Sequence, residues 1–184
     1  MNTIILILII GIVAIFLIKS FNRHQSSKDN ESDVYVVRMG QAVKADEAFE
    51  ASSSRDLNRM LKAVSTDTNP IDRHFLLQTI VDETYKKRKD QEMRRICKEI
   101  GEKHLSEFPS IAQPLKKEFE NIFPRVTTFQ HLATVYSEDG NYDRAIDICK
   151  IALSYDLHDN TQSGFEGRIE RIRKKKVKHQ NQKD

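Results

Sequence analysis

The sequence predicts an all-α protein in which a single N-terminal transmembrane helix precedes a short α–α superhelix that ends in a capping helix. Three observations predict this fold. An uncharged apolar run lies near the N-terminus, apolar residues recur at helical spacing over most of the remaining chain, and only 6 glycines and 4 prolines occur in 184 residues. The composition, 39% hydrophobic and 31% charged, supports one packed domain and excludes a polytopic membrane protein.

The N-terminal apolar run covers residues 3–18 and reads TIILILIIGIVAIFLI. Such a helix rises about 1.5 Å per residue and is slightly short for a hydrocarbon core of about 30 Å. Phe21 extends the apolar surface, and Lys19 reaches toward the headgroups. A cleaved signal peptide is the alternative, but it requires basic residues before the run, and none is present. We therefore expect a lipid-embedded transmembrane anchor over residues 1–21.

Charges beside this segment predict its orientation. Lys19, Arg23 and Lys28 follow the run, and no charged side chain precedes it. Basic residues favour the cytoplasmic side of a membrane. We therefore expect a single-pass membrane protein with its N-terminus outside and its helical domain in the cytoplasm.

Residues 22–41 are expected to form a polar tether and an entry arm. The first part, up to residue 32, is polar and lacks an apolar period. Residues 34–37 read VYVV and resemble a strand, but no second strand is evident downstream. A helical entry or an extended arm is therefore expected there.

The helical domain is expected to span residues 42–179. Residues 42–51 and 56–64 carry apolar residues at a spacing of three and four, which predicts a first pair of helices. The next helix is predicted to begin at Asn69-Pro70, because Asn is a favoured cap and Pro suits the first helical position.

Two further helices are predicted downstream. Asp90 is a suitable capping residue for a helix with a long apolar stripe, and Pro109 is expected to end that helix. A shorter helix is then expected over residues 110–123.

The most specific pattern spans residues 126–159. Small residues alternate with large ones around Gly140, as two closely packed antiparallel helices joined by a tight turn require. The pattern consists of Phe129, Leu132, Ala133, Tyr136, Gly140, Tyr142, Ala145, Cys149 and Ala152. This spacing resembles the tetratricopeptide repeat, a helical hairpin of about 34 residues, although Leu157 stands where the family has a proline.

A fainter copy of the repeat covers residues 74–108. The tripeptide Ile-Cys-Lys at residues 96–98 recurs at residues 148–150, and Arg88 replaces the turn glycine. The resemblance implies a short superhelix with a concave face.

Such a superhelix needs about three units. Residues 42–64 are therefore expected to supply another helix pair, residues 165–179 a basic capping helix, and residues 180–184 a tail.

In tetratricopeptide domains the first helix of each repeat lines a groove that binds a protein or peptide segment. The matching residues are Thr127, Gln130, Thr134, Ser137 and Glu138 in the clear repeat, and Phe75, Gln78, Asp82, Tyr85 and Lys86 in the degenerate one. Chaperone-binding members hold a terminal carboxylate with a Lys and an Asn at two of these positions, where this chain has Gln130 and Thr134, then Gln78 and Asp82. The resemblance thus implies an unidentified partner of another kind.

No catalytic pattern occurs in the sequence. It has no HExxH, no phosphate-binding glycine loop and no GxSxG. Cys97 and Cys149 fall at predicted core positions, and His131 is expected on a solvated helix surface. We therefore expect no enzymatic activity, no cofactor and no metal site.

The C-terminal segment is strongly basic. The chain carries +3 overall, residues 19–28 carry +3 and residues 168–184 carry +6, which leaves −6 for residues 29–167. Its basic side chains before the tail are Arg168, Arg171, Arg173, Lys174, Lys175, Lys176 and Lys178. Three interpretations compete. These side chains form a solvated helix end, or they contact anionic lipid headgroups, or, as the least favoured interpretation, they contact nucleic acid.

The sequence as a whole predicts a membrane-anchored protein-interaction adaptor or scaffold facing the cytoplasm. The alternative is an electrostatic binder of an anionic membrane surface or a nucleic acid through the basic C-terminal helix.

Overall fold

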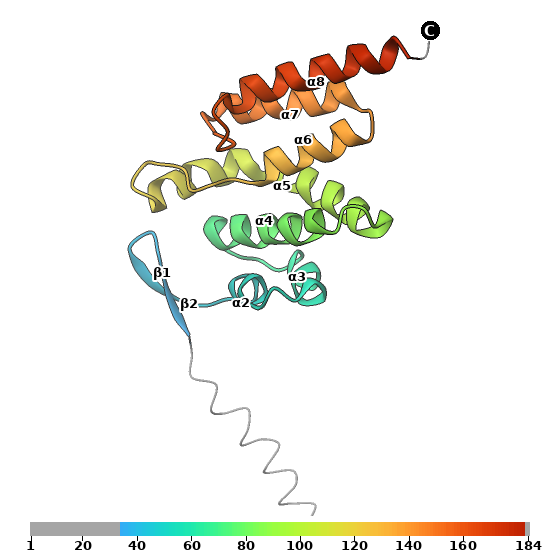
Figure 1. Ribbon diagram of the computed structural model, residues 1–184. Helices are drawn as coiled ribbons and strands as arrows, with labels where there is room; N and C mark the ends of the chain where they lie inside the picture. The colour runs from blue at the N-terminus through green and yellow to red at the C-terminus, as the bar shows by residue number, and fades with distance from the viewer. Residues whose placement is uncertain (1–33, 183–184) are drawn as a thin grey trace, which may run out of the picture. The chain divides into compact units, whose positions relative to one another are not determined.

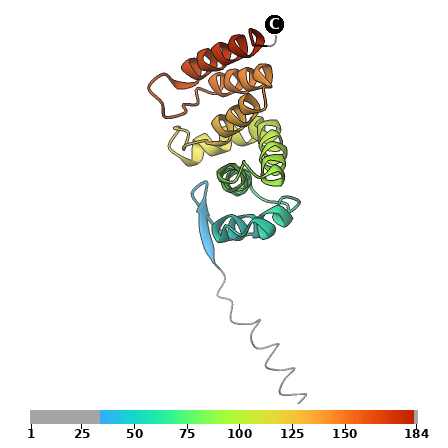
Figure 2. The same cartoon turned by 45° about the vertical axis from the view of Figure 1, so that its right-hand side comes forward.

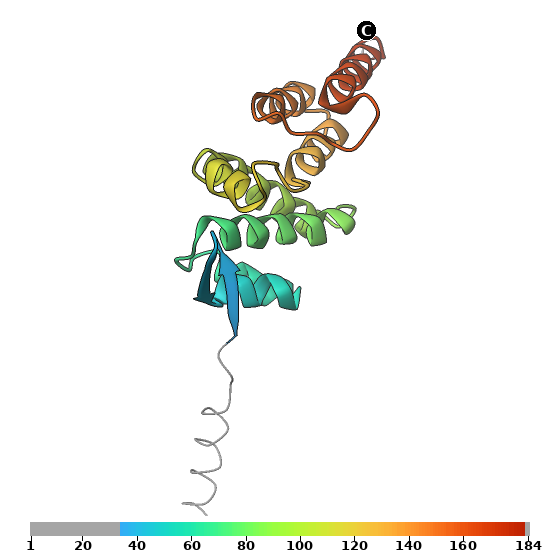
Figure 3. The same cartoon turned by 90° about the vertical axis from the view of Figure 1, so that its left-hand side faces the viewer.

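A computed structural model describes residues 34–182, and most of them are helical (Figure 1). The described residues from 36 to 182 belong to one compact unit. The described elements are β1 (Tyr35–Arg38), β2 (Gln41–Lys44), α2 (Glu47–Ser54), α3 (Leu57–Ala63), α4 (Pro70–Lys86), α5 (Gln91–Glu118), α6 (Thr128–Glu138), α7 (Tyr142–Ser154) and α8 (Gly164–Gln180). Within this unit successive helices are stacked on one another from α2 to α8 (Figures 2 and 3).

Within residues 34–182 no helix combines the length and the apolar character that a membrane crossing requires. The longest, α5, has 28 residues but carries charged side chains along its whole length. The predicted fold class, membrane location and cytoplasmic orientation are corrected accordingly, because the described helices give them no support. The predicted anchor over residues 1–21 and the tether before residue 34 lie outside the described residues.

The expectation of an entirely α-helical domain is also corrected, because β1 and β2 pair as a two-stranded hairpin. Met39 and Gly40 form its turn with φ values of 54° and 77°, the left-handed geometry that two-residue hairpins favour. Arg38 attaches the hairpin to α4 through Asp72 Oδ1, at 2.6 Å and 3.0 Å from its guanidinium nitrogens. The helix expected from residue 42 therefore begins only at Glu47, after the strand.

Capping side chains fix the helix starts that the sequence predicted. Asn69 Oδ1 accepts hydrogen bonds from the amides of Ile71 and Asp72, both at 3.0 Å, and Pro70 is the first residue of α4. Asp90 Oδ1 accepts from the amide of Met93 at 2.9 Å at the start of α5. These two predictions are confirmed.

The predicted break at Pro109 is wrong, because α5 continues through both Pro109 and Pro114 to Glu118. A proline inside a helix costs about 3 kcal/mol, whereas each large apolar side chain that becomes buried contributes about 1.5–3 kcal/mol. The helix that continues past the prolines keeps three such side chains buried: Phe108, Ile111 and Leu115. Burial on one face of α5 therefore outweighs the two prolines.

The predicted helical hairpin at residues 126–159 is confirmed as α6 and α7. Gly140 connects them with a φ of 78°, and the amide of Asn141 donates to the carbonyl of Tyr136 at 2.9 Å. The small residues Ala133, Ala145 and Ala152 are fully buried, so the two helices approach closely. A helix, α8, also occupies the residues expected to form the capping helix, and residues 74–108 form a second helical hairpin from α4 and α5.

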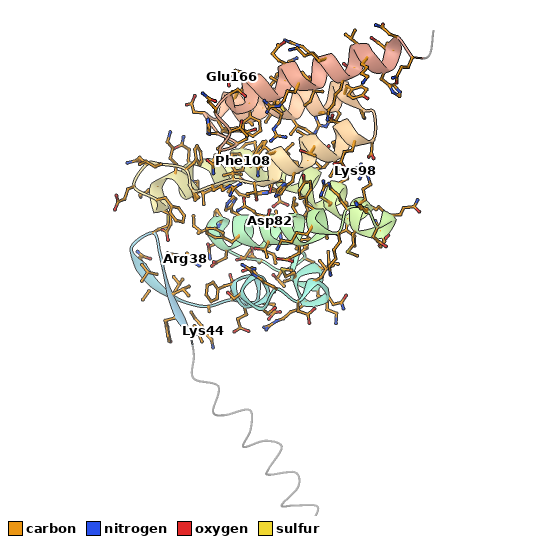
Figure 4. The ribbon with its side chains drawn as sticks, viewed as in Figure 1. Arg38, Lys44, Asp82, Lys98, Phe108 and Glu166 are labelled. Atoms are coloured by element: carbon orange, nitrogen blue, oxygen red, sulfur yellow. The ribbon has the colours of Figure 1, made fainter. Side chains whose placement is uncertain are left out.

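The core consists of two clusters. One surrounds Phe108, Phe129 and Phe165 and joins α5, α6, α7 and α8, and the other surrounds Met60 and Leu77 and joins the N-terminal helices to α5. Figure 4 shows Phe108 inside the stack. Because α5 contributes to both clusters, it links the two halves of the domain.

Gly140→Val should lower the free energy of unfolding by about 1 kcal/mol or more, because a β-branched residue resists positive φ. An added Cβ meets no heavy atom within 4 Å, so the loss reports backbone strain and not a clash. Urea denaturation of the full-length chain measures it. Gly140→Asn is the control, since Asn tolerates this conformation and should cost less. Equal losses for both variants would contradict the assigned turn.

Candidate functional site

A hollow of about 370 Å³ lies between α4 and the start of α6, and we call it the α4–α6 hollow. Four of the residues that the sequence placed in a groove line it: Asp82, Tyr85, Lys86 and Thr127. They come from both predicted repeats, so the structure brings together side chains more than 40 residues apart in the sequence. The sequence did not indicate the other five lining residues, which are Arg55, Thr79, Glu83, Arg125 and His131.

Asp82, labelled in Figure 4, is the side chain on which the contacts within the hollow converge. The Thr127 hydroxyl donates to Asp82 Oδ1 at 2.6 Å, and His131 Nε2 lies 3.2 Å from the same oxygen. The His131 ring stacks on Tyr85, with the ring centroids 3.8 Å apart and the planes 18° from parallel. The His131 ring is thus part of the site and not the solvated surface residue that the sequence suggested.

Gln78 determines the path of the chain into α6. Its Oε1 accepts from the amide of Thr127 at 2.9 Å, and its Nε2 donates to the carbonyl of Arg125 at 3.2 Å. Both polar groups of Gln78 are therefore used to hold the backbone. Gln78 therefore positions the wall of the hollow. The sequence had predicted it as a groove residue that contacts the partner, but its polar groups are already engaged.

Charged side chains form the rim of the hollow. Glu83 Oε1 lies 2.7 Å from Lys86 Nζ and 3.9 Å from the Arg55 guanidinium, so these three neutralise one another in part. Arg125 is exposed, and within residues 34–182 its side chain forms no ion pair. An unpaired guanidinium at the rim is suited to an anionic group.

The other predicted groove residues have structural roles. Phe75 packs edge-on against Phe119, Gln130 and Ser137 are buried, and Glu138 pairs with Arg88 and Arg94. Thr134 accepts a hydrogen bond from Arg168 of α8 at 3.0 Å.

The predicted groove residues of α6 therefore do not all lie in the α4–α6 hollow. Arg168 of α8 reaches Thr134, and Arg88 and Arg94 of the α4–α5 hairpin hold Glu138, so these contacts occupy the far end of the helix. The open surface is confined to its first turn.

The basic residues of α8 also separate into two groups. Arg168 is bound to the buried carboxylate of Asp159 at 2.9 Å. Arg171 donates to the Ser163 hydroxyl, Arg173 pairs with Glu170, and Lys176 pairs with Asp143. In the described part of the chain Lys174, Lys175 and Lys178 form no ion pair and are exposed. Only these three match the predicted freely available basic surface.

A buried histidine pair, which the sequence did not reveal, joins α4, α5 and α6. His74 Nδ1 lies 3.0 Å from His104 Nε2, and His104 Nδ1 lies 2.8 Å from the Thr128 hydroxyl. Burial lowers the pKa of His74 to about 4 and holds the pKa of His104 well below its usual value. Both rings are therefore neutral near pH 7 and act as a structural connection.

The two cysteines are buried, as the sequence predicted. Burial raises the pKa of the Cys97 thiol to about 11 and that of Cys149 to about 12. Within residues 34–182 no group of three or more His, Cys, Asp or Glu side chains is arranged to hold a metal ion.

No protein-family model matches the chain, and no curated protein or solved structure matches it either. The tetratricopeptide resemblance therefore stays a prediction from the residue spacing.

Acidification should destabilise the domain through the histidine pair. Because the folded-state pKa of His74 is about 4, below the ordinary value of 6.5, the unfolded chain binds more protons as the pH falls from 6.5 toward 4. Protonation of His74 in the unfolded chain should by itself lower the free energy of unfolding by about 2 kcal/mol as the pH falls from 7 to 5. Urea denaturation at both pH values measures this loss.

His74→Phe is the matched variant, because it keeps a ring at this buried position and removes the group that titrates. It also removes the contact between His74 Nδ1 and His104 Nε2, so each protein is compared with itself at the two pH values. The variant should show a smaller loss between pH 7 and pH 5 than the natural chain. The same pH dependence in both proteins would contradict the assignment.

Proposed function

We propose that the protein is a tetratricopeptide-like interaction protein, an adaptor or scaffold, that binds a segment of another protein in the α4–α6 hollow. The single observation that carries this proposal is the position of the hollow. It lies between the first helices of two consecutive helical hairpins and contains groove residues predicted from each hairpin, such as Asp82 and Thr127.

The side chains in the α4–α6 hollow are held in fixed positions, which supports binding. Asp82 is held by Thr127 and His131, and Tyr85 is held by stacking on His131. Side chains that are fixed before binding lose little conformational entropy when a partner arrives. The Tyr85 ring is held between the His131 ring and the Arg88 guanidinium, whose carbon lies 4.2 Å from the Tyr85 centroid. Aromatic and charged side chains held together in this way are common where proteins recognise one another.

A second candidate function is electrostatic binding of a polyanion such as a nucleic acid by α8. The observation that favours it is the exposure of Lys174, Lys175 and Lys178, which have no ion pairs in the described part of the chain. Arg171 lies on the same face, because residues three, four and seven positions apart are aligned along a helix. Such binding would weaken steeply as salt increases.

A site-specific photocrosslink tests the proposed function. Lys86, whose side chain is exposed at the rim of the α4–α6 hollow, is replaced by p-benzoylphenylalanine in the full-length chain, and Lys174 is replaced likewise as the control. After irradiation in intact cells we expect a discrete protein adduct from position 86 and none from position 174, because only the first lies in the hollow. Mass spectrometry of the adducts measures this.

The Tyr85→Ala background provides the second control, because it removes the ring that holds His131 and Arg88 in place. The position 86 adduct should decrease at least about fivefold in that background. An adduct that persists unchanged, or adducts from position 174 alone, would contradict the proposal, and the latter would favour the second candidate.

A further inference from the structure

A second hollow, of about 390 Å³, lies beside the α4–α6 hollow, and we call it the loop hollow. The segment between α5 and α6 and the segment between α7 and α8 form its walls. Arg125 lines both hollows, so the two meet at this residue. A bound chain that fills both must pass across the Arg125 side chain.

Arg125 is held in place from below. Gln78 binds its carbonyl and the amide of Thr127, so the backbone on both sides of the guanidinium is fixed to α4. The side chain itself is exposed and has no ion pair in the described part of the chain. A planar guanidinium on a fixed backbone is well suited to two parallel hydrogen bonds with a carboxylate.

The charges around Arg125 favour an acidic occupant. Lys86 and Arg55 lie on one side, and Lys116 lines the loop hollow on the other. The opposing carboxylates are Asp82, Glu83 and Asp156. Asp82 accepts from Thr127 and lies beside His131, and Glu83 is paired with both Lys86 and Arg55. Arg125 and Lys116 form no ion pair in the described part of the chain, so they are the cations left for an acidic occupant.

The loop hollow also offers apolar surface. Phe123 and Pro124 line it and are partly exposed, and Ile122 beside them is 72% exposed, the highest value among the exposed large hydrophobic residues of the domain. The Lys116 ammonium lies 5.4 Å from the centroid of the Phe123 ring, so a cation borders this apolar surface. An apolar side chain of a partner fits here if its neighbour carries a negative charge.

We propose that the occupant is an extended segment of another protein in which an apolar residue precedes or follows acidic residues. One Asp or Glu carboxylate pairs with Arg125, the apolar side chain enters the loop hollow, and a further acidic side chain faces Lys86 and Arg55. This inference rests on the proposed function, because it specifies what the α4–α6 hollow binds.

A peptide selection tests it. A random dodecapeptide library displayed on phage is selected on the immobilised full-length chain, and the enriched peptides are synthesised and measured by fluorescence anisotropy. We expect enriched peptides that carry acidic residues next to an apolar one. Arg125→Gln should weaken their binding at least about tenfold, because it removes the charge from the centre of the site.

Matched controls separate the outcomes. Arg125→Lys should retain part of the affinity, Lys174→Gln should retain all of it, and circular dichroism should show every variant folded, since both side chains are exposed. This inference would be overturned if the enriched peptides lacked acidic residues, or if Arg125→Gln did not change their affinity. The proposed function would still stand in that case, provided that Tyr85→Ala weakened their binding.

Two other results are informative. Failure to enrich any peptide, or enriched peptides unaffected by Tyr85→Ala, would overturn the proposed function together with this inference. In a competition assay, single-stranded DNA and a phosphoserine peptide are compared with the unlabelled acidic peptide. If either displaces the labelled peptide at a lower concentration, Arg125 prefers phosphate to carboxylate. That result would overturn this inference but not the proposed function.

Discussion

The candidate site depends on the contact between Gln78 and the backbone just before α6. The side-chain amide of Gln78 donates to one carbonyl and accepts from one amide, and so fixes residues 125–127 against α4. Backbone polar groups near the end of a long connection need partners if they are partly buried. Because α4 supplies these partners, α6 starts at a defined place and its first turn faces α4.

Three properties of the site follow from that contact. Thr127 is brought within hydrogen-bonding distance of Asp82, His131 is brought over Tyr85, and Arg125 is directed to the boundary between the two hollows. The aromatic core around Phe108 and Phe129 supplies the rigidity, since it packs the same region of α6 against α5. Positioning and rigidity thus come from different elements, α4 for the first and α5 for the second.

Local chemistry explains which features could be predicted from the sequence. The caps at Asn69 and Asp90 and the turn at Gly140 depend on residues within three positions, and the sequence predicts all of them correctly. The break at Pro109 was predicted wrongly, because burial on a distant core overrides a local preference. The β-hairpin was missed for a similar reason, since its attachment through Asp72 is a contact across 34 residues.

The residues of the candidate site also divide into those that local spacing predicts and those that depend on distant contacts. Repeat spacing predicts a shared groove for Asp82, Tyr85, Lys86 and Thr127, and these four side chains line one hollow. Spacing does not identify Arg125, which lies in a connection with no repeat position, or the structural use of Gln78. It also cannot show that Arg168 would engage Thr134, because that contact requires α8 to fold back onto the hairpin.

The central claim is that the hollows meeting at Arg125 form the binding surface, and nuclear magnetic resonance tests it most directly. Amide shifts of the isotope-labelled full-length chain are followed as a selected acidic dodecapeptide is added. The account predicts that the largest changes cluster at residues 79–86 and 122–131, with α8 nearly unaffected. Changes concentrated at Arg171, Lys174, Lys175 and Lys178, with residues 79–86 unchanged, would contradict it.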